Sequence, residues 1–239
     1  MSGIFRFKQF SIDQTGCAMK VNTDGVLLGA MAAFDSPSHI LDIGTGTGVI
    51  ALMLAQRFPS ALVDALEIDE TAAEMAARNF AGSPFAQRMR SCPVPLDAFE
   101  ATVSYHLIVS NPPFFIHSLK SHDVRKQVAR HADTGFFDGL LERAAKWLAP
   151  RGSLQLVLPV ALAAWVENRA TGTYGMTVQW QTDIRSFSAQ PPIRRILAIG
   201  KAPLDDVAGE MHRDLVIYEH RGVYSQNYRE LLKDFFLAF

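Results

Sequence analysis

The sequence predicts an α/β fold with a seven-stranded, mostly parallel sheet, an antiparallel closing strand and helices on both faces. From Ile40 onward, short apolar runs alternate with helix-like segments, as in sheets whose parallel strands are joined by helices. A glycine-rich turn at residues 44–48 connects the first of these runs to a helix-like segment. With 239 residues and 49% hydrophobic content, the chain can bury a core of this size.

Hydrophobic periodicity locates the individual elements. Apolar runs that fit buried strands lie near residues 39–43, 61–67, 88–92, 105–110, 152–158, 174–184 and 193–200. Apolar residues at helical spacing predict helices over 47–58, 71–79 and 136–148. The two long strands after the fifth are joined across residues 188–192, so we expect them to form an antiparallel closing hairpin.

We expect one domain over residues 1–239, because no repeat, low-complexity tract or Pro/Gly-rich linker divides the chain. Two short additions flank the core. The amino-terminal extension, residues 1–37, includes alternating phenylalanines and a helix candidate at 25–34, and the carboxyl-terminal addition, residues 210–239, includes an apolar run at 215–218 and a helix candidate at 228–236.

Composition excludes several classes of protein. The net charge is −1, from 23 basic and 24 acidic residues, so any nucleic-acid-binding surface must be local. Cys17 and Cys92 lie far apart and form no CxxC, which indicates neither a disulfide framework nor a zinc site. No apolar signal core or membrane-spanning run is present, and we expect a cytoplasmic protein.

The tetrapeptide Asn111-Pro112-Pro113-Phe114 follows the apolar run 107–110 and is typical of an amine-methylation site. Two prolines end the strand because neither can donate to the ladder, and each holds the preceding residue extended. The site therefore lies at the carboxyl end of a strand, where open α/β sheets bind ligands. The alternative is a plain strand-ending turn with a core Phe.

An amine bound to a base or a carbonyl is a poor nucleophile, because its lone pair is delocalised. Asn111 can accept one N–H through its side-chain oxygen while the Pro112 carbonyl accepts the other, which aims the nitrogen at an electrophilic methyl group. Phe114 can then stack on the planar target. We therefore assign catalytic roles to Asn111, Pro112 and Phe114.

Residues 40–48 form a strand, a glycine-rich turn and the start of a helix. The order G-x-G-x-G after Asp42 suits the methionine part of S-adenosylmethionine better than the phosphates of a dinucleotide, which favour G-x-G-x-x-G. Glu67 ends the next strand, where a carboxylate can bind ribose hydroxyls. Asp69 is a competitor, and both acids can instead cap the following helix. The expected cofactor contacts are Asp42, Gly44, Thr45, Gly46, Gly48, Glu67, Ile68 and Asn111.

The strings Arg6-Phe7-Lys8-Gln9-Phe10 and Met19-Lys20-Val21-Asn22-Thr23-Asp24-Gly25-Val26-Leu27-Leu28-Gly29-Ala30, followed by the glycine loop and Asn-Pro-Pro-Phe, resemble the bacterial tRNA1(Val) (adenine-37-N6)-methyltransferases over almost the whole chain. These enzymes are Rossmann-like class I S-adenosylmethionine-dependent methyltransferases. The resemblance implies N6-methylation of the adenosine beside the anticodon, with Lys20 and Thr23 near the methionine end of the cofactor. Taken alone, these two residues are a surface lysine and a helix cap.

Two positions depart from the family pattern. The family generally places an acid at the end of the third strand to meet the cofactor adenine, whereas spacing puts Pro95 there. Asp97 or a backbone group can take the place of that acid. His106 stands where the strand before Asn-Pro-Pro usually carries Asp, and we interpret it as a structural variant.

Basic residues near the tetrapeptide are candidates for RNA contacts. The polar segment 117–131, the turn before the last predicted strand and the amino terminus supply Lys120, Arg125, Lys126, Arg130, His131, Arg194, Arg195, Arg6 and Lys8. The alternative is ordinary solvated charge. The expected partner is a tRNA anticodon stem-loop, whose unpaired bases are easily flipped. We assign no metal, because His117 and His122 lack a third ligand, and we expect a monomer.

Three other functions are compatible with parts of the pattern. Another amine methyltransferase, acting on release-factor glutamine, DNA adenine or rRNA guanine N2, would share the same pocket. A catalytically silent RNA-binding module is opposed by the intact Asp42, Gly44, Gly46, Glu67 and Asn111. A nicotinamide-dependent dehydrogenase is disfavoured by the glycine spacing.

Overall fold

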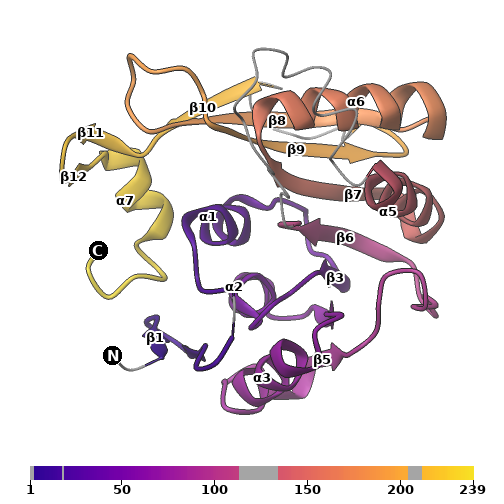
Figure 1. Cartoon of the computed structure of the whole chain (residues 1–239), viewed down its shortest axis with the longest axis horizontal. Helices are drawn as coiled ribbons and strands as arrows, with labels where there is room; N and C mark the ends of the chain where they lie inside the picture. Colours follow the sequence, from indigo (N-terminus) through magenta and orange to yellow (C-terminus); the bar gives the residue numbers. More distant parts are fainter. Residues whose placement is uncertain (1–2, 18, 113–133, 204–211) are drawn as a thin grey trace.

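The computed structural model describes residues 3–17, 19–112, 134–203 and 212–239, and its centre is one eight-stranded sheet (Figure 1). The strands are β3 (His39–Ile43), β4 (Leu62–Leu66), β5 (Met89–Cys92), β6 (Tyr105–Ser110), β7 (Leu148–Leu158), β8 (Thr177–Arg185), β9 (Arg194–Gly200) and β10 (His212–Val216). Their order is β10-β8-β9-β7-β6-β3-β4-β5, and only β9 runs antiparallel to its neighbours in this sheet. The predicted fold class is confirmed.

The predicted number of strands was one short. β10 pairs in parallel with the outer side of β8, with Leu215 opposite Ile184. The sequence pattern correctly indicated an apolar run there, but we assigned it to a separate addition. An unpaired strand edge presents backbone N–H and C=O groups that a further strand can satisfy, and β10 does so for β8.

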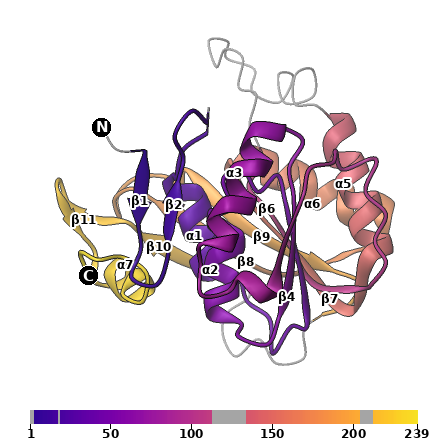
Figure 2. The same ribbon diagram turned by 90° about the horizontal axis from the view of Figure 1, so that it is seen from below.

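Helices cover both faces of the sheet (Figure 2). On one face lie α1 (Thr23–Met31), α2 (Val49–Arg57) and α3 (Glu70–Ala81), and on the other lie α5 (Thr134–Trp147) and α6 (Val160–Tyr174). Because α6 extends to Tyr174, β8 starts three residues later than the expected 174–184 strand. No helix in the described ranges is both long and apolar enough to cross a membrane.

Alternating strand residues supply two separate hydrophobic cores. Ile40 and Val109 face α1 and α2, whereas their strand neighbours Leu41 and Ile108 face α5 and α6. All four side chains are fully buried, with an exposed fraction of 0%. This explains why the central strands appear as continuous apolar runs: a parallel sheet covered on both faces buries every side chain.

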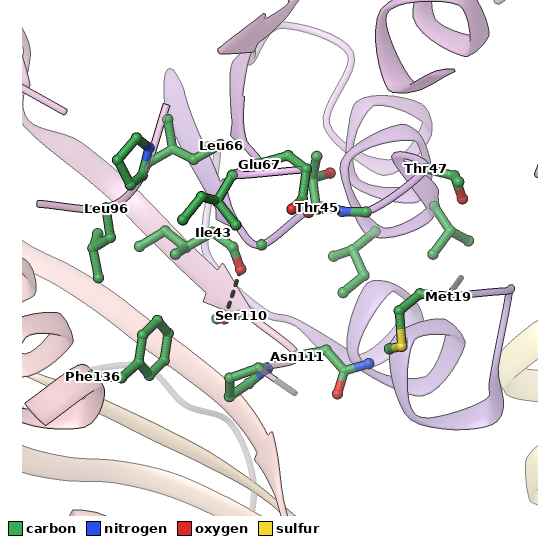
Figure 3. Close-up of a pocket in the computed structure, with 18 of the residues that line it drawn as sticks. Met19, Ile43, Thr45, Thr47, Leu66, Glu67, Leu96, Ser110, Asn111 and Phe136 are labelled. Carbon is green, nitrogen blue, oxygen red and sulfur yellow. Dashed lines mark hydrogen bonds between the residues drawn. The ribbon is translucent and has the colours of Figure 1, made fainter. Parts of the chain in front are cut away.

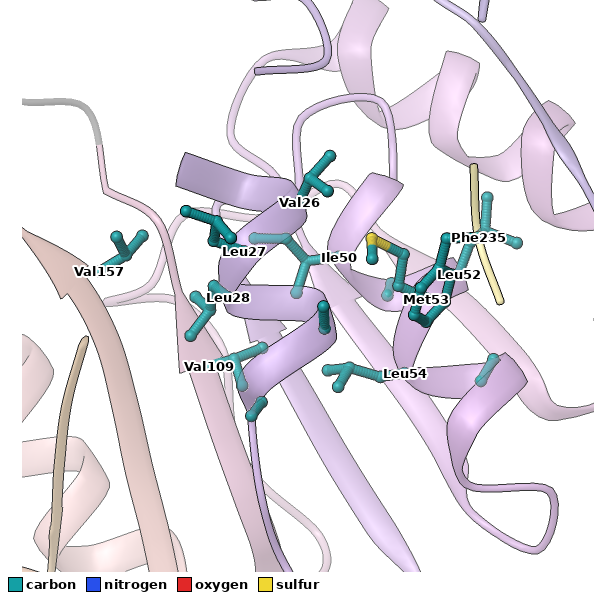
Figure 4. Packing of buried hydrophobic residues seen from close by; sticks show 14 of the residues in the cluster. Val26, Leu27, Leu28, Ile50, Leu52, Met53, Leu54, Val109, Val157 and Phe235 are labelled. Carbon is teal, nitrogen blue, oxygen red and sulfur yellow. The ribbon is translucent and has the colours of Figure 1, made fainter. Parts of the chain in front are cut away.

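The helix α1 is held close to α2 (Figure 4). Gly29 permits the approach, since a Cβ atom at that position would lie 2.8 Å from Sδ of Met53. Arg57, in the last turn of α2, donates from Nη1 to the carbonyl of Gly29 at 3.0 Å and also to that of Ala32. The carboxyl end of α1 is therefore satisfied by a side chain of its neighbour, as helix ends require.

The two terminal segments contact each other. The amino-terminal hairpin of β1 (Ile4–Arg6) and β2 (Ser11–Asp13) lies beside α7 (Gln226–Leu232) and the residues after it. Phe7 forms a bridge with Phe236. A second small hairpin, β11 (Tyr218–His220) with β12 (Val223–Tyr224), precedes α7.

Leu28 of α1 provides a test of this packing. It is 0% exposed within the α1–α2 core, so Leu28→Ala removes buried methyl groups and leaves a cavity. We expect the free energy of unfolding to fall by about 2–5 kcal/mol. Urea titration monitored by circular dichroism measures it. The matched change Leu237→Ala, at a side chain 65% exposed, should shift stability by less than about 0.5 kcal/mol.

Candidate active site

The register of three neighbouring strands brings the sequence motifs together. Ile43 of β3 pairs with Ser110 of β6 on one side and with Leu66 of β4 on the other. Ser110 also donates from Oγ to the Ile43 carbonyl at 2.7 Å. The residues that follow these strand ends, including Glu67 and Asn111, therefore emerge side by side at one edge of the sheet. This edge is the place where open α/β sheets bind ligands.

The glycine loop lies between the other two motifs. The amides of Gly44 and Thr45 both donate to the Leu66 carbonyl at 2.9 Å. Gly44, Gly46 and Gly48 have φ values of 72°, 57° and 93°, a region that other residues rarely adopt. At Gly48 a Cβ would also lie 2.4 Å from the ring of Phe80. The G-x-G-x-G order is thus required by the backbone itself.

Asp42 supports this loop from below. It is 0% exposed, and its Oδ2 accepts from the Thr45 hydroxyl at 2.6 Å and from the Ala51 amide at 3.2 Å. Its Oδ1 is buried without a hydrogen-bond partner among the described residues. Burial raises the pKa of Asp42 to about 7, although these hydrogen bonds act in the opposite direction.

The two acids after β4 have separate roles in the structure. Glu67 is half-buried and turns back to the loop, accepting from the Gly46 amide at 2.8 Å. Asp69 is the N-cap of α3 and accepts from the Ala72 amide at 2.8 Å. Asp69 is therefore the residue that caps α3, whereas Glu67 lies between the loop and that cap, because its other oxygen accepts from the Asp69 amide at 3.0 Å.

A pocket of about 570 Å³ opens at this sheet edge (Figure 3). This volume lies within the roughly 300–1,000 Å³ of small-molecule sites. Among the residues that the sequence predicted, the pocket is lined by Lys20, Gly44, Thr45, Gly46, Glu67, Ile68, Asn111 and Pro112. Thr23, Asp42 and Gly48 were also predicted to bind the cofactor but do not line it. Thr23 starts α1, and Asn22 rather than Thr23 caps that helix.

One end of the pocket is apolar. Leu96 and Phe136 lie together there in Figure 3, and Val94 and Pro95 complete that wall. Both positions considered for the missing acid, Pro95 and Asp97, line the pocket. The site thus combines an apolar slot with the carboxylate of Glu67 and the backbone of the loop.

Several lining residues were not predicted from the sequence. Gly135, Gly139 and Arg143 of α5 line the pocket from the far side. They recur every fourth residue, and this spacing on one helix face was a signal that could have identified them. Met19 lines the pocket with 54% of its surface exposed.

Asn111 is positioned by the amino-terminal turn of α1. It is half-buried, and its Nδ2 donates to Oδ1 of Asn22 at 3.4 Å. Pro112 is buried beside it. Phe114 lies outside the described residues, so its predicted stacking role stays a prediction.

The basic residues predicted to bind RNA fall into three groups. Lys120, Arg125, Lys126, Arg130 and His131 lie outside the described residues. Arg6 and Lys8 are exposed on the amino-terminal hairpin, where Lys8 donates to the Phe239 carbonyl at 2.7 Å. Arg194 pairs with Asp24 of α1 at 2.7 Å, and Arg195 pairs with the buried Asp183 at 2.7 Å. No described member of the set lines the pocket.

His106 has a packing role in the structure. Its ring meets Phe34 edge-on at a centroid distance of 5.6 Å, and its Nδ1 is buried without a described partner. Within the described ranges, no group of three or more His, Cys, Asp or Glu side chains could hold a metal ion.

The buried carboxyl of Asp42 predicts a pH dependence of stability. Between its ordinary pKa of 3.8 and about 7, the folded protein keeps a proton that the unfolded chain has lost. The contribution of Asp42 to the free energy of unfolding is therefore largest below pH 3.8. Between that pH and about 7 it falls by about 1.4 kcal/mol per pH unit. Asp42→Asn cannot ionise but retains an oxygen acceptor.

We therefore expect the stability of wild type relative to Asp42→Asn to fall by about 2 kcal/mol between about pH 5 and about pH 7. Urea unfolding of both proteins at each pH measures this difference, and other titrating groups cancel. A difference that stays constant with pH would mean that Asp42 is ionised throughout.

Comparisons with known proteins agree with this geometry. Residues 22–164 match the family described as Methyltransferase small domain. The chain is 49% identical to the tRNA1(Val) (adenine(37)-N6)-methyltransferase of Pedobacter heparinus over 241 residues, covering 100% of both chains. It is 42% identical to the protein of the same name from Porphyromonas gingivalis, covering 98% of this chain and 94% of that one.

A solved structure supports the fold. A predicted O-methyltransferase from Agrobacterium tumefaciens matches with a TM-score of 0.64 and 19% identity, over 89% of this chain and 96% of that one. Because full-length identity to the named relatives exceeds 40%, the chain belongs to the tRNA1(Val) (adenine(37)-N6)-methyltransferase family, within the methyltransferase small domain family.

Proposed function

We propose that this protein transfers a methyl group from S-adenosylmethionine to N6 of adenosine 37, beside the anticodon of tRNA1(Val). Its full-length relatives carry this name. The observation that carries the proposal is the position of Asn111-Pro112, directly beside the glycine loop at the edge formed by β3 and β6. A planar amine and a methyl donor can meet only where these two motifs adjoin.

The residues of the pocket fit S-adenosylmethionine. The positive-φ loop exposes backbone to the methionine part, with Lys20 near its carboxylate. Glu67 can accept from the ribose hydroxyls, and the slot of Val94, Leu96 and Phe136 suits the adenine ring. When bound, this cofactor supplies an electrophilic sulfonium methyl group.

The chain itself positions the amine. The Asn111 side-chain oxygen and the Pro112 carbonyl accept hydrogen bonds from the two N6–H groups, which directs the nitrogen lone pair toward the cofactor side of the pocket. Phe114 would stack on the base. No strong base is required before transfer, since the nitrogen becomes acidic only after it gains the methyl group, and it can then lose one proton to water. Catalysis then rests on positioning and on the loss of charge at sulfur.

The proposed partner is a tRNA anticodon stem-loop, met in the cytoplasm. Arg6, Lys8 and the basic residues between 117 and 131 are proposed phosphate contacts. Arg194 and Arg195 have carboxylate partners within the chain, so their share in this surface is the weaker part of the proposal.

A methylation assay tests the function. The protein is incubated with S-adenosylmethionine and matched tRNA1(Val) transcripts bearing A or G at position 37, and the digested nucleosides are identified by mass spectrometry. We expect N6-methyladenosine from the A37 transcript and none from its G37 match. Equal label on both transcripts, or none on either, would refute the position-specific activity. A release-factor protein as substrate tests the glutamine alternative.

Glu67 provides a test of cofactor binding. Glu67→Gln keeps an oxygen that can accept from Gly46, but it removes the negative charge that strengthens hydrogen bonds from ribose hydroxyls. It also replaces the oxygen that accepts from the Asp69 amide by an NH2 that cannot accept. We expect S-adenosylmethionine to bind about tenfold more weakly, or about 1.4 kcal/mol, by isothermal titration calorimetry. The matched change Asp69→Asn retains a good N-cap and should leave affinity within about twofold. If Asp69→Asn instead weakened cofactor binding and Glu67→Gln did not, Asp69 would be the residue that binds the ribose.

A further inference from the structure

Asn22 joins the start of α1 to the proposed catalytic amide. As the N-cap of α1, it accepts the Gly25 amide on Oδ1 at 2.9 Å. The same oxygen accepts from Nδ2 of Asn111 at 3.4 Å. At its other end, Nδ2 of Asn22 donates to the Lys20 carbonyl at 3.3 Å. One side chain therefore links the start of α1, the backbone of Lys20 and the side chain of Asn111.

Backbone groups determine which way the Asn22 amide points. The Gly25 N–H can only donate, and the Lys20 carbonyl can only accept. Together they fix the oxygen of Asn22 toward Gly25 and its nitrogen toward Lys20. Because this oxygen also faces Asn111, the group that Asn111 presents to it must be the NH2 and not the carbonyl.

The consequence reaches the proposed reaction. With the NH2 of Asn111 held against Asn22, the side-chain oxygen of Asn111 can accept a hydrogen bond from the substrate amine. Turned over, Asn111 would present its NH2 to the N6 amine, so that two donors would oppose each other.

We propose that Asn22 is a positioning residue that sets the amide orientation of Asn111, an inference that rests on the proposed amine methylation. Asn22 acts through Asn111 and does not itself need to touch the substrate. This role is distinct from helix capping, because the Asn22 oxygen accepts from the Gly25 amide in the cap and from Nδ2 of Asn111 in the positioning contact.

Two substitutions separate these roles. Asn22→Ser retains a good N-cap, since a serine hydroxyl can reach the helix amides, but it is too short to accept from Asn111. Asn22→Asp retains both acceptor functions, because a carboxylate oxygen can accept hydrogen bonds from the Gly25 amide and from Asn111 together. It loses the hydrogen bond that Nδ2 donates to the Lys20 carbonyl. A residue that only capped α1 would tolerate both changes equally.

The measurements are the single-turnover methylation rate on the A37 transcript, the S-adenosylmethionine affinity by calorimetry and the melting temperature. For Asn22→Ser we expect a methylation rate about tenfold lower, because loss of one hydrogen bond lowers the population of the productive Asn111 orientation by about that factor. The affinity for S-adenosylmethionine should stay within about twofold of wild type, and the melting temperature should be unchanged. Asn22→Asp should restore the rate to within about threefold of wild type. A wild-type rate for Asn22→Ser, or equal losses in both variants, would overturn the proposal.

A second measurement does not depend on activity. The side-chain NH2 of Asn111, assigned by its disappearance in Asn111→Ser, can be followed by nuclear magnetic resonance in 15N-labelled protein. Its exchange with water should be faster in Asn22→Ser than in wild type and remain slow in Asn22→Asp. If wild type fails to methylate the A37 transcript, the proposed function fails, and this exchange still decides the role of Asn22. Equal exchange in wild type and Asn22→Ser would exclude the contact.

Discussion

The parallel register of β4, β3 and β6 is the constraint on which the candidate site depends. Pairing of Ile43 with both Leu66 and Ser110 brings three strand ends level. Motifs that are far apart in sequence then lie on one line at the sheet edge. A shift of one residue in either pairing would turn the flanking side chains to the opposite face, so the buried apolar residues on both faces protect the site geometry.

The loop above β3 combines a backbone that only glycine adopts easily with a carboxyl group that is costly to bury. Its glycines adopt positive φ values, and beneath them lies a carboxyl group shielded from water. Hydrogen bonds from Thr45 and Ala51 partly offset the burial of Asp42.

Sequence reasoning located most of the frame and part of the site. Central strands and helices were predictable because a doubly covered parallel sheet leaves strong apolar periodicity, and the glycine turn has one backbone solution. The eighth strand was assigned wrongly, since a short run such as 212–216 gives no sign of which edge it will join. Asn22 was missed because its importance arises from a contact with Asn111 that no local pattern encodes. The pocket-lining face of α5 left only a four-residue spacing as a signal, and that spacing does not show which cavity the helix will face.

The contact between the two terminal segments has a consequence for the order of folding. Lys8 donates to a carbonyl 231 positions away, and Phe7 pairs with Phe236. Closing so long a loop has a high entropic cost, so such contacts form after the local ones. During synthesis on a ribosome, which proceeds from the amino end, the β1–β2 hairpin cannot contact the segment after α7 until nearly all of the sheet has been synthesised. The first-made segment is therefore among the last to reach its native place.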